Sequence, residues 1–327
     1  MKKLLSFIMS LILLIGVAGC TSTNEIVFAD AQWDSIQFHN AVAGFIAVEA
    51  FDYDKWSELS ATTPATHLGL INGEIDVHME EWADNIPSYA DDLEAGEFVE
   101  LGINFDDNFQ GLYVPRYVIE GDAERGIEPM APNLKTVEDL KDYAHIFPDE
   151  DDSSKGRIYG AIPGWEVDEI LRRKVEYMKL DEQFVYFNPG SEFGLASAFT
   201  NAYENGEAIV GYYWEPTWLM GLYDFVLLED EPFTTVEDFQ AGKTEMPPMD
   251  IRIAVSNDFY ERDPEFSEFL SNYYSTSALI SEALAYTQEH NVDFTETAKW
   301  YLRENDSMID EWLDSERAQM VRDALAR

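Results

Sequence analysis

The fold class is decided by residues 208–218, AIVGYYWEPTW, in which a short apolar run ends in an aromatic cluster and a proline turn. An apolar run of this length, bounded by turn residues, is typical of a buried strand. Similar runs lie at residues 25–29, 74–79, 98–101, 112–119, 158–162, 225–228 and 251–255. Apolar residues at helical spacing lie between these runs, at residues 167–178, 194–203, 266–286 and 307–325. The alternation predicts an α/β fold with largely parallel sheets.

Proline and glycine mark two breaks in this alternation. Pro115 interrupts one strand-like run, which predicts an edge strand or a segment that crosses between lobes, and the loop-like residues 120–133 follow it. The second break comes at Pro232 and at residues 246–249, MPPM. Because the breaks flank the middle third of the chain, we expect one lobe to be inserted into another, with two crossings between them. The predicted bounds are residues 25–117 and 231–327 for the first lobe and 118–230 for the second.

The chain is strongly acidic. It has 327 residues, with 21 Lys or Arg and 64 Asp or Glu, so its formal net charge is 21 − 64 = −43. Nucleic acid is excluded as a partner, because phosphate backbones are held by dense basic patches. Hydrophobic residues make up 46%, enough for a sizeable core. We interpret the scattered acids as an adaptation to a saline medium, the alternative being an ordinary acidic surface.

The N-terminus carries an export signal. Two lysines, Lys2 and Lys3, precede an apolar run at residues 4–18, and Gly19-Cys20 follows it. The run is shorter than the ~20 residues of a spanning helix but suits a signal-peptide core. Its end resembles the lipobox of bacterial lipoproteins, in which the Cys is lipidated. We therefore expect a signal peptide at 1–19, a lipidated tether at 20–24, and a protein outside the cytoplasm that a lipid anchors to the membrane.

Metal and cofactor chemistry has little support in the sequence. The single Cys excludes a disulfide framework and any site with several Cys ligands. The five His residues show no HExxH or similar ligand spacing. Glycine-rich phosphate and dinucleotide loops are missing as well. The sequence predicts neither a metal site nor a cofactor.

Four tryptophans stand where elements end. Trp82 follows the strand in GEIDVHMEEW, Trp165 lies in AIPGWEVDE, and Trp214 lies in the segment quoted first. Trp33 comes just after the first strand. Strand ends are where α/β folds place ligands, and indole faces attract a quaternary ammonium, which donates no strong hydrogen bond. Indole also stacks on sugar rings, so a carbohydrate ligand stays open at this point.

A family resemblance runs over nearly all of residues 25–325. The chain resembles the extracellular solute-binding proteins of glycine betaine and proline betaine ABC importers. The resemblance implies a type II periplasmic-binding-protein fold, with two α/β lobes on a two-strand hinge that close on a ligand. It also implies an ABC permease with its ATPase as partner, osmoprotective uptake and no catalysis. Its motifs are the lipobox, GEIDVHMEEW (73–82), LYVPRYVI (112–119), YGAIPGWEVDEI (159–170), NPGSEFGL (188–195), VGYYWEPTW (210–218), SALISEALAYTQEH (277–290) and ETAKWYL (296–302).

The resemblance also assigns a ligand site. In the family an aromatic cage holds the trimethylammonium group, and its positions match Trp82, Trp165 and Trp214. The amides after the PGW turn, those of Glu166 and Val167, match the pair that binds the ligand's carboxylate. A helix start presents free N–H groups that suit an anion. Glycine betaine is therefore the expected ligand.

One departure from the family leaves choline and carnitine open. Family members often place a His a few residues after a cage Trp, but Ile86 and Thr217 stand at the corresponding positions. We expect Arg116, near the crossing between lobes, to substitute for that His as a carboxylate partner. Acids beside the cage would favour choline, which has no carboxylate. The acids in question are Glu80, Glu81 and Glu215.

Two other classes of protein are alternatives to a solute-binding protein. A secreted glycosidase would use paired carboxylates such as Glu81 and Glu215 beside Trp platforms, held about 5 to 9.5 Å apart. The absence of an eight-fold barrel pattern speaks against it. A purely structural surface lipoprotein would leave the tryptophans without a common purpose. A binding protein without catalysis is the leading interpretation.

The acidity makes a prediction about salt. Screening shortens the reach of charge repulsion from about 10 Å at 0.1 M salt to about 3 Å at 1 M. Because the net charge is −43, we expect the melting temperature, followed by circular dichroism, to rise with NaCl. A flat or falling curve between about 0.1 M and about 2 M would remove the saline interpretation.

Overall fold

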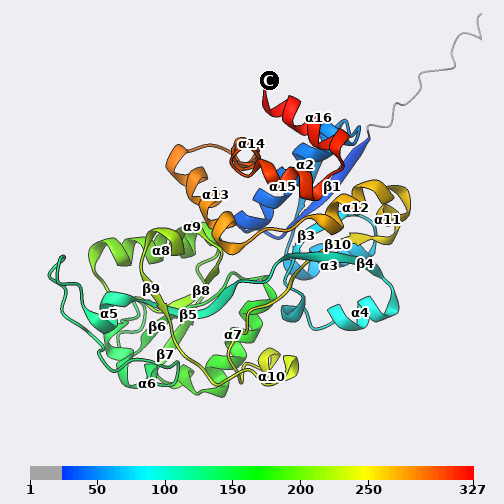
Figure 1. Ribbon diagram of the computed structural model, residues 1–327. Helices are drawn as coiled ribbons and strands as arrows, with labels where there is room; N and C mark the ends of the chain where they lie inside the picture. Colours follow the sequence, from blue (N-terminus) through cyan, green and yellow to red (C-terminus); the bar gives the residue numbers. More distant parts are fainter. Residues whose placement is uncertain (1–23) are drawn as a thin grey trace, which may run out of the picture.

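Two α/β lobes, each built on a five-stranded sheet, form the protein (Figure 1). The structure is a computed structural model that describes residues 24–327. The predicted signal peptide and the lipidation site Cys20 lie outside the described residues. Each sheet is half parallel and half antiparallel rather than largely parallel, because in each a strand returning from the other lobe runs against its neighbours.

The first lobe contains the first sheet and the C-terminal helices. Its strand order is β2-β1-β3-β10-β4, with β10 antiparallel to both neighbours. The strands are β1 (Glu25–Asp30), β2 (Lys55–Ser60), β3 (Val77–Glu81), β4 (Phe98–Phe105) and β10 (Ile251–Ser256). The helices are α2 (Asp34–Ala50), α3 (Thr63–Ile71), η2 (Ala83–Asn85), α4 (Tyr89–Ala95), α11 (Asn257–Arg262), α12 (Pro264–Asn272), α13 (Ser277–His290), α14 (Phe294–Glu304), α15 (Asp306–Trp312) and α16 (Ser315–Leu325).

The second lobe repeats this arrangement. Its strand order is β7-β6-β8-β5-β9, with β5 antiparallel to both neighbours. The strands are β5 (Phe109–Pro115), β6 (Gly156–Tyr159), β7 (Phe184–Phe187), β8 (Gly211–Glu215) and β9 (Phe225–Leu227). The helices are α5 (Arg116–Glu120), α6 (Leu140–Tyr143), η3 (Ala144–Ile146), α7 (Glu166–Tyr177), η4 (Leu180–Glu182), α8 (Glu192–Asn205), α9 (Trp218–Leu222) and α10 (Val236–Gln240).

Two chain segments cross between the lobes and are bonded to each other. The first crossing joins β4 to β5, and the second leads into β10 (Figure 1). The Asn108 side chain donates from Nδ2 to the Met249 carbonyl at 2.5 Å, and its Oδ1 accepts from the Met249 amide at 3.1 Å. Both residues are buried. One side chain therefore keeps the two crossings together.

The chain passes from the first sheet to the second before residue 118, where the second lobe was predicted to begin. Those bounds stay a prediction, but β5 pairs within the second sheet although it precedes residue 118. Pro115 is accordingly the last residue of an interior strand, opposite Phe225, rather than part of an edge strand. Its missing N–H costs no ladder bond there, because the strand ends at that residue. The crossing lies at residues 106–108, before the proline that suggested it.

The long helix α2 is the centre of the first lobe. It is buried on almost every side, including His39 and Asn40. The C-terminal helices α13, α14 and α16 pack against it, and Figure 1 shows them gathered around it. A helix covered on all faces carries no polar stripe. None of the helices in residues 24–327 is long and apolar enough to cross a membrane.

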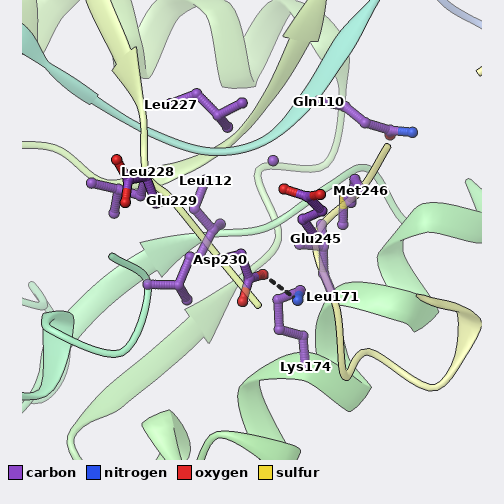
Figure 2. A pocket seen from close by; sticks show the side chains of 12 residues that line it. Gln110, Leu112, Leu171, Lys174, Leu227, Leu228, Glu229, Asp230, Glu245 and Met246 are labelled. Atoms are coloured by element: carbon purple, nitrogen blue, oxygen red, sulfur yellow. Dashed lines mark hydrogen bonds and ion pairs between the residues drawn. The ribbon is translucent and has the colours of Figure 1, made fainter. Parts of the chain in front are cut away.

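A buried ion pair attaches the segment after β9 to the second lobe. The ammonium group of Lys174 on α7 bonds to the carboxylate of Asp230, as Figure 2 shows, and its Nζ donates to the Thr244 carbonyl at 2.7 Å. The side chains of Lys174 and Asp230 are 3% and 8% exposed. A buried charge that loses its partner is strongly destabilising.

We expect Lys174→Met to lower the free energy of unfolding by about 3 kcal/mol, because Asp230 then lies buried without its cation. The double variant Lys174→Met/Asp230→Leu should recover most of this loss, since it removes both charges. Urea unfolding of the two variants and the parent protein measures both quantities. A loss of less than about 1 kcal/mol in the single variant would contradict this account of the pair.

Candidate functional site

Four tryptophans from the two lobes surround one small cavity. Trp33 and Trp82 come from the first lobe, where they follow β1 and β3. Trp165 and Trp214 come from the second lobe, at the start of α7 and on β8. All four are buried. The complete lining is Trp33, Thr63, Trp82, Asn85, Trp165, Glu166, Val167, Tyr212 and Trp214.

The rings stand nearly perpendicular to one another. Trp165 meets Trp33 edge to face, with ring centroids 5.6 Å apart and planes at 90°. It meets Trp214 in the same way at 5.1 Å and 86°. Tyr212 stacks beside Trp214 at 5.8 Å and 19°. Perpendicular rings present several faces to one point, which is the geometry of an aromatic cage.

Hydrogen bonds between the lobes close the structure over this cavity. The Trp165 indole Nε1 donates to the Ala31 carbonyl at 3.1 Å. The Thr63 amide donates to the Gly164 carbonyl, also at 3.1 Å. Gly164 has φ +100°, and a Cβ there would lie 2.6 Å from Cγ2 of Thr62. The PGW turn therefore needs glycine both for its backbone conformation and for contact with the first lobe.

Three helices begin at the cavity. Trp33 is the N-cap residue of α2, Thr63 is the first residue of α3, and Glu166 and Val167 open α7. No side chain caps the start of α7. The first amides of a helix have no partner inside the helix, so they offer positive potential. At α3 the Thr63 amide already donates to Gly164, and at α2 the Asp34 amide donates to the Glu192 carboxylate at 3.1 Å, so α7 is the start best placed to receive an anion.

The acids at the start of α7 leave its amides accessible. The Asp168 carboxylate is occupied elsewhere, since it accepts from Tyr186 Oη and Asn188 Nδ2 at 2.7 Å and from Arg172 Nε at 3.1 Å. Burial raises the pKa of Glu166. The Asp168 carboxylate is thus held by other side chains rather than by the first amides of α7.

Several predicted residues lie away from the cavity. Arg116 begins α5 on the surface of the second lobe, where it forms ion pairs with Asp224 at 2.9 Å and Glu120 at 3.1 Å. The expectation that it substitutes for the missing His has no geometric basis, because these carboxylates hold its guanidinium on the surface. Glu81 bonds to His67 Nδ1 at 3.1 Å and Glu215 accepts from Tyr113 at 3.2 Å, and neither lines the cavity.

Sequence reasoning missed three lining residues. Tyr212 stands two positions before Trp214 on β8, so the two-residue period of a strand puts both on one face. That signal was available. Asn85 in η2 and Thr63 at the start of α3 line the cavity only because the lobes meet there. No local sequence pattern predicts their place in the lining.

A second, larger cavity lies within the second lobe (Figure 2). Its lining includes Gln110, Leu171, Lys174, Asp230 and Met246. Its only cation, Lys174, is already paired with Asp230, and its remaining walls are mostly aliphatic. It has no aromatic faces, and its charges besides the Lys174–Asp230 pair are the carboxylates of Glu229 and Glu245, so the Trp cavity is the better candidate for holding a cation on aromatic faces. Residues 24–327 contain no group of three potential metal-ligating side chains.

Solved structures with the same architecture are solute-binding proteins. An ABC-transporter choline binding protein in complex with choline aligns over 93% of this chain and 99% of its own, with 20% identity and a TM-score of 0.72. ProX from Borrelia burgdorferi, a glycine betaine and L-proline transporter binding protein, aligns over 91% and 99% at 18% identity and 0.70. Lactococcal OpuAC, closed on glycine betaine, aligns over 88% and 99% at 18% identity and 0.67. These likenesses confirm the predicted fold.

No curated protein matches the chain in sequence. A family profile does, and its description is the substrate binding domain of ABC-type glycine betaine transport systems. It matches residues 24–304, which include every residue of the Trp cavity. The chain therefore belongs to the OpuAC family of substrate-binding domains of ABC-type glycine betaine transporters.

Proposed function

We propose that the protein captures a quaternary ammonium solute, glycine betaine first, in the Trp cavity and delivers it to an ABC permease with its ATPase. The observation that carries this proposal is the meeting of four indoles from two lobes around one cavity. Family membership supports the role of solute receptor. Choline and carnitine share the trimethylammonium group and are the alternative ligands.

The cavity suits a cation that cannot donate strong hydrogen bonds. Its walls are mainly the faces and edges of Trp33, Trp82, Trp165 and Trp214, with Tyr212 beside them. Each aromatic face attracts a cation by about 0.5 to 2 kcal/mol, so several together give useful affinity. Closure removes water and strengthens this attraction.

The helix starts favour a ligand that also carries an anion. The amides at the start of α7, those of Glu166 and Val167, lie at the cavity beside the start of α3. These groups suit the carboxylate of betaine and give nothing comparable to the hydroxyl of choline. This supports betaine as the first ligand.

The proposal is one of binding without chemical change. A glycosidase would use Glu81 and Glu215 as its pair of carboxylates. Each of them is bonded within its own lobe and lies outside the cavity lining. A lipid anchor at Cys20 would keep the protein near its permease outside the cytoplasm. Uptake of a compatible solute agrees with the acidity of the chain, since cells in brine import such solutes to balance osmotic pressure.

We expect Trp82→Ala, Trp165→Ala and Trp214→Ala each to weaken betaine binding roughly tenfold, because each loses about 1 to 2 kcal/mol of cation–π attraction. Isothermal titration calorimetry in high salt measures this, with circular dichroism to show that the fold is intact. Arg116→Gln is the matched control and should bind betaine like the parent protein, because Arg116 lies on the surface. Unchanged affinity in two of the three Trp variants would overturn the cage.

We expect betaine to bind more tightly than choline at neutral pH, because only betaine carries a charge for the amides of Glu166 and Val167. Titration of both ligands in one buffer gives the ratio. Choline bound about ten times more tightly than betaine would contradict the assignment of these amides to a carboxylate.

A further inference from the structure

We propose that Glu80 is a positioning residue of the cage: it holds the Trp82 indole and supplies, through that ring, the negative charge that balances a bound cation. This inference rests on the proposed function and concerns how the net charge of a ligand affects its affinity for the cage. Glu80 is the residue before the last of β3 and is fully buried. It lies behind the cavity wall rather than in it.

The contacts of Glu80 lead directly to the cage. Its Oε1 accepts from the Trp82 indole Nε1 at 3.0 Å and from Ser35 Oγ at 3.0 Å. Its Oε2 is buried without a hydrogen-bond partner, and so is Nε1 of Trp33. The Trp82 N–H is thus bonded to this carboxyl, and the Trp33 side chain lies close enough to it to lower its pKa.

Within residues 24–327, no cationic side chain is paired with this carboxyl. Among the ion pairs of residues 24–327 none includes Glu80. His78, on the same strand, accepts from the Glu80 backbone amide through Nδ1 at 3.3 Å, and burial lowers the pKa of its ring. A buried carboxylate without a partner is costly, so the fold leaves a charge that the ligand can balance.

The Trp82 indole lies between Glu80 and the cavity, and it transmits the effect of the carboxylate charge to a bound cation. A carboxylate that accepts the indole N–H forms a charge-assisted hydrogen bond and pushes electron density onto the ring. A ring richer in electrons attracts a cation on its face more strongly. Trp82 is buried, with 7% of its surface exposed, so the interaction is weakly screened.

Protonation of Glu80 connects this charge to pH. Burial raises the pKa of Glu80 to about 8, against the lowering effect of the Trp82, Ser35 and Trp33 side chains. Without ligand the carboxyl is therefore mostly protonated at neutral pH. A bound cation favours the ionised form and lowers this pKa, so binding releases a proton and affinity rises with pH until about 8. Choline has a net charge of one, whereas the carboxylate of betaine offsets its own cation.

Other ionisable groups surround Glu80 and need to be separated from it. They are acidic or neutral: Asp30 on β1, Asp34 and His39 on α2, Glu192 on α8 of the second lobe, and Tyr273 after α12. Burial raises the pKa of Asp34 to about 6 and lowers that of His39 to about 3, both below the range tested here. Burial, with Asp34 and Glu80 nearby, also raises the pKa of Glu192.

The test is the affinity for choline and for betaine from about pH 7 to about pH 9, in which neither ligand changes charge. We expect the choline affinity of the parent protein to rise by up to about tenfold per pH unit and then level off, with a much smaller change for betaine. Glu80→Gln keeps an acceptor for the indole and should abolish the rise. Calorimetry in buffers of different ionisation enthalpy should detect the released proton in the parent only.

Two further variants show which carboxyl group causes the rise of choline affinity with pH. Glu58→Gln removes a carboxyl on β2 that accepts from Asn40, away from the cage, and should behave like the parent. Glu192→Gln should retain the rise. A rise that persists in Glu80→Gln, or one lost in Glu192→Gln alone, would overturn the inference. A parent protein that binds betaine and choline with no pH dependence would overturn it while leaving the proposed function intact, and one that binds neither ligand would overturn both.

Discussion

Attraction between a cation and indole faces is strong only when water is removed, and this requirement governs the whole structure. Neither lobe can enclose a ligand alone, because Trp33 and Trp82 belong to one lobe and Trp165 and Trp214 to the other. The bond from the Trp165 indole to the Ala31 carbonyl makes a cage wall part of the contact between lobes. A ligand that fills the cavity therefore contacts both lobes at once.

The rest of the fold brings these four side chains to one place. Strand ends and helix starts put them at the facing edges of the two sheets, where α/β folds offer both apolar walls and free amides. Asn108 and Met249 bond the two crossings to each other, so the lobes are joined at one place. The acidic surface has no part in this arrangement, whereas the buried acid Glu80 lies behind the cavity wall and accepts from the Trp82 indole.

Local sequence patterns predicted the features that depend on neighbouring residues, namely most strands and the tryptophans at their ends. Short apolar runs located most strands, and the tryptophans at strand ends located the cage. The helix α2 was missed because it is buried on nearly all sides and so shows no amphipathic period. The strand β2 was missed because its residues KWSELS pack at a sheet edge with little apolar content. The position of Arg116, like the contributions of Thr63 and Asn85, depends on how distant segments meet, which no local pattern contains.

The most direct test of the account is a crystal structure of the mature protein grown with glycine betaine. The account predicts electron density for the trimethylammonium group among Trp33, Trp82, Trp165 and Trp214, with the carboxylate at the amides of Glu166 and Val167. Density in the second cavity, beside Lys174 and Asp230, with the Trp cavity closed and without ligand, would contradict it.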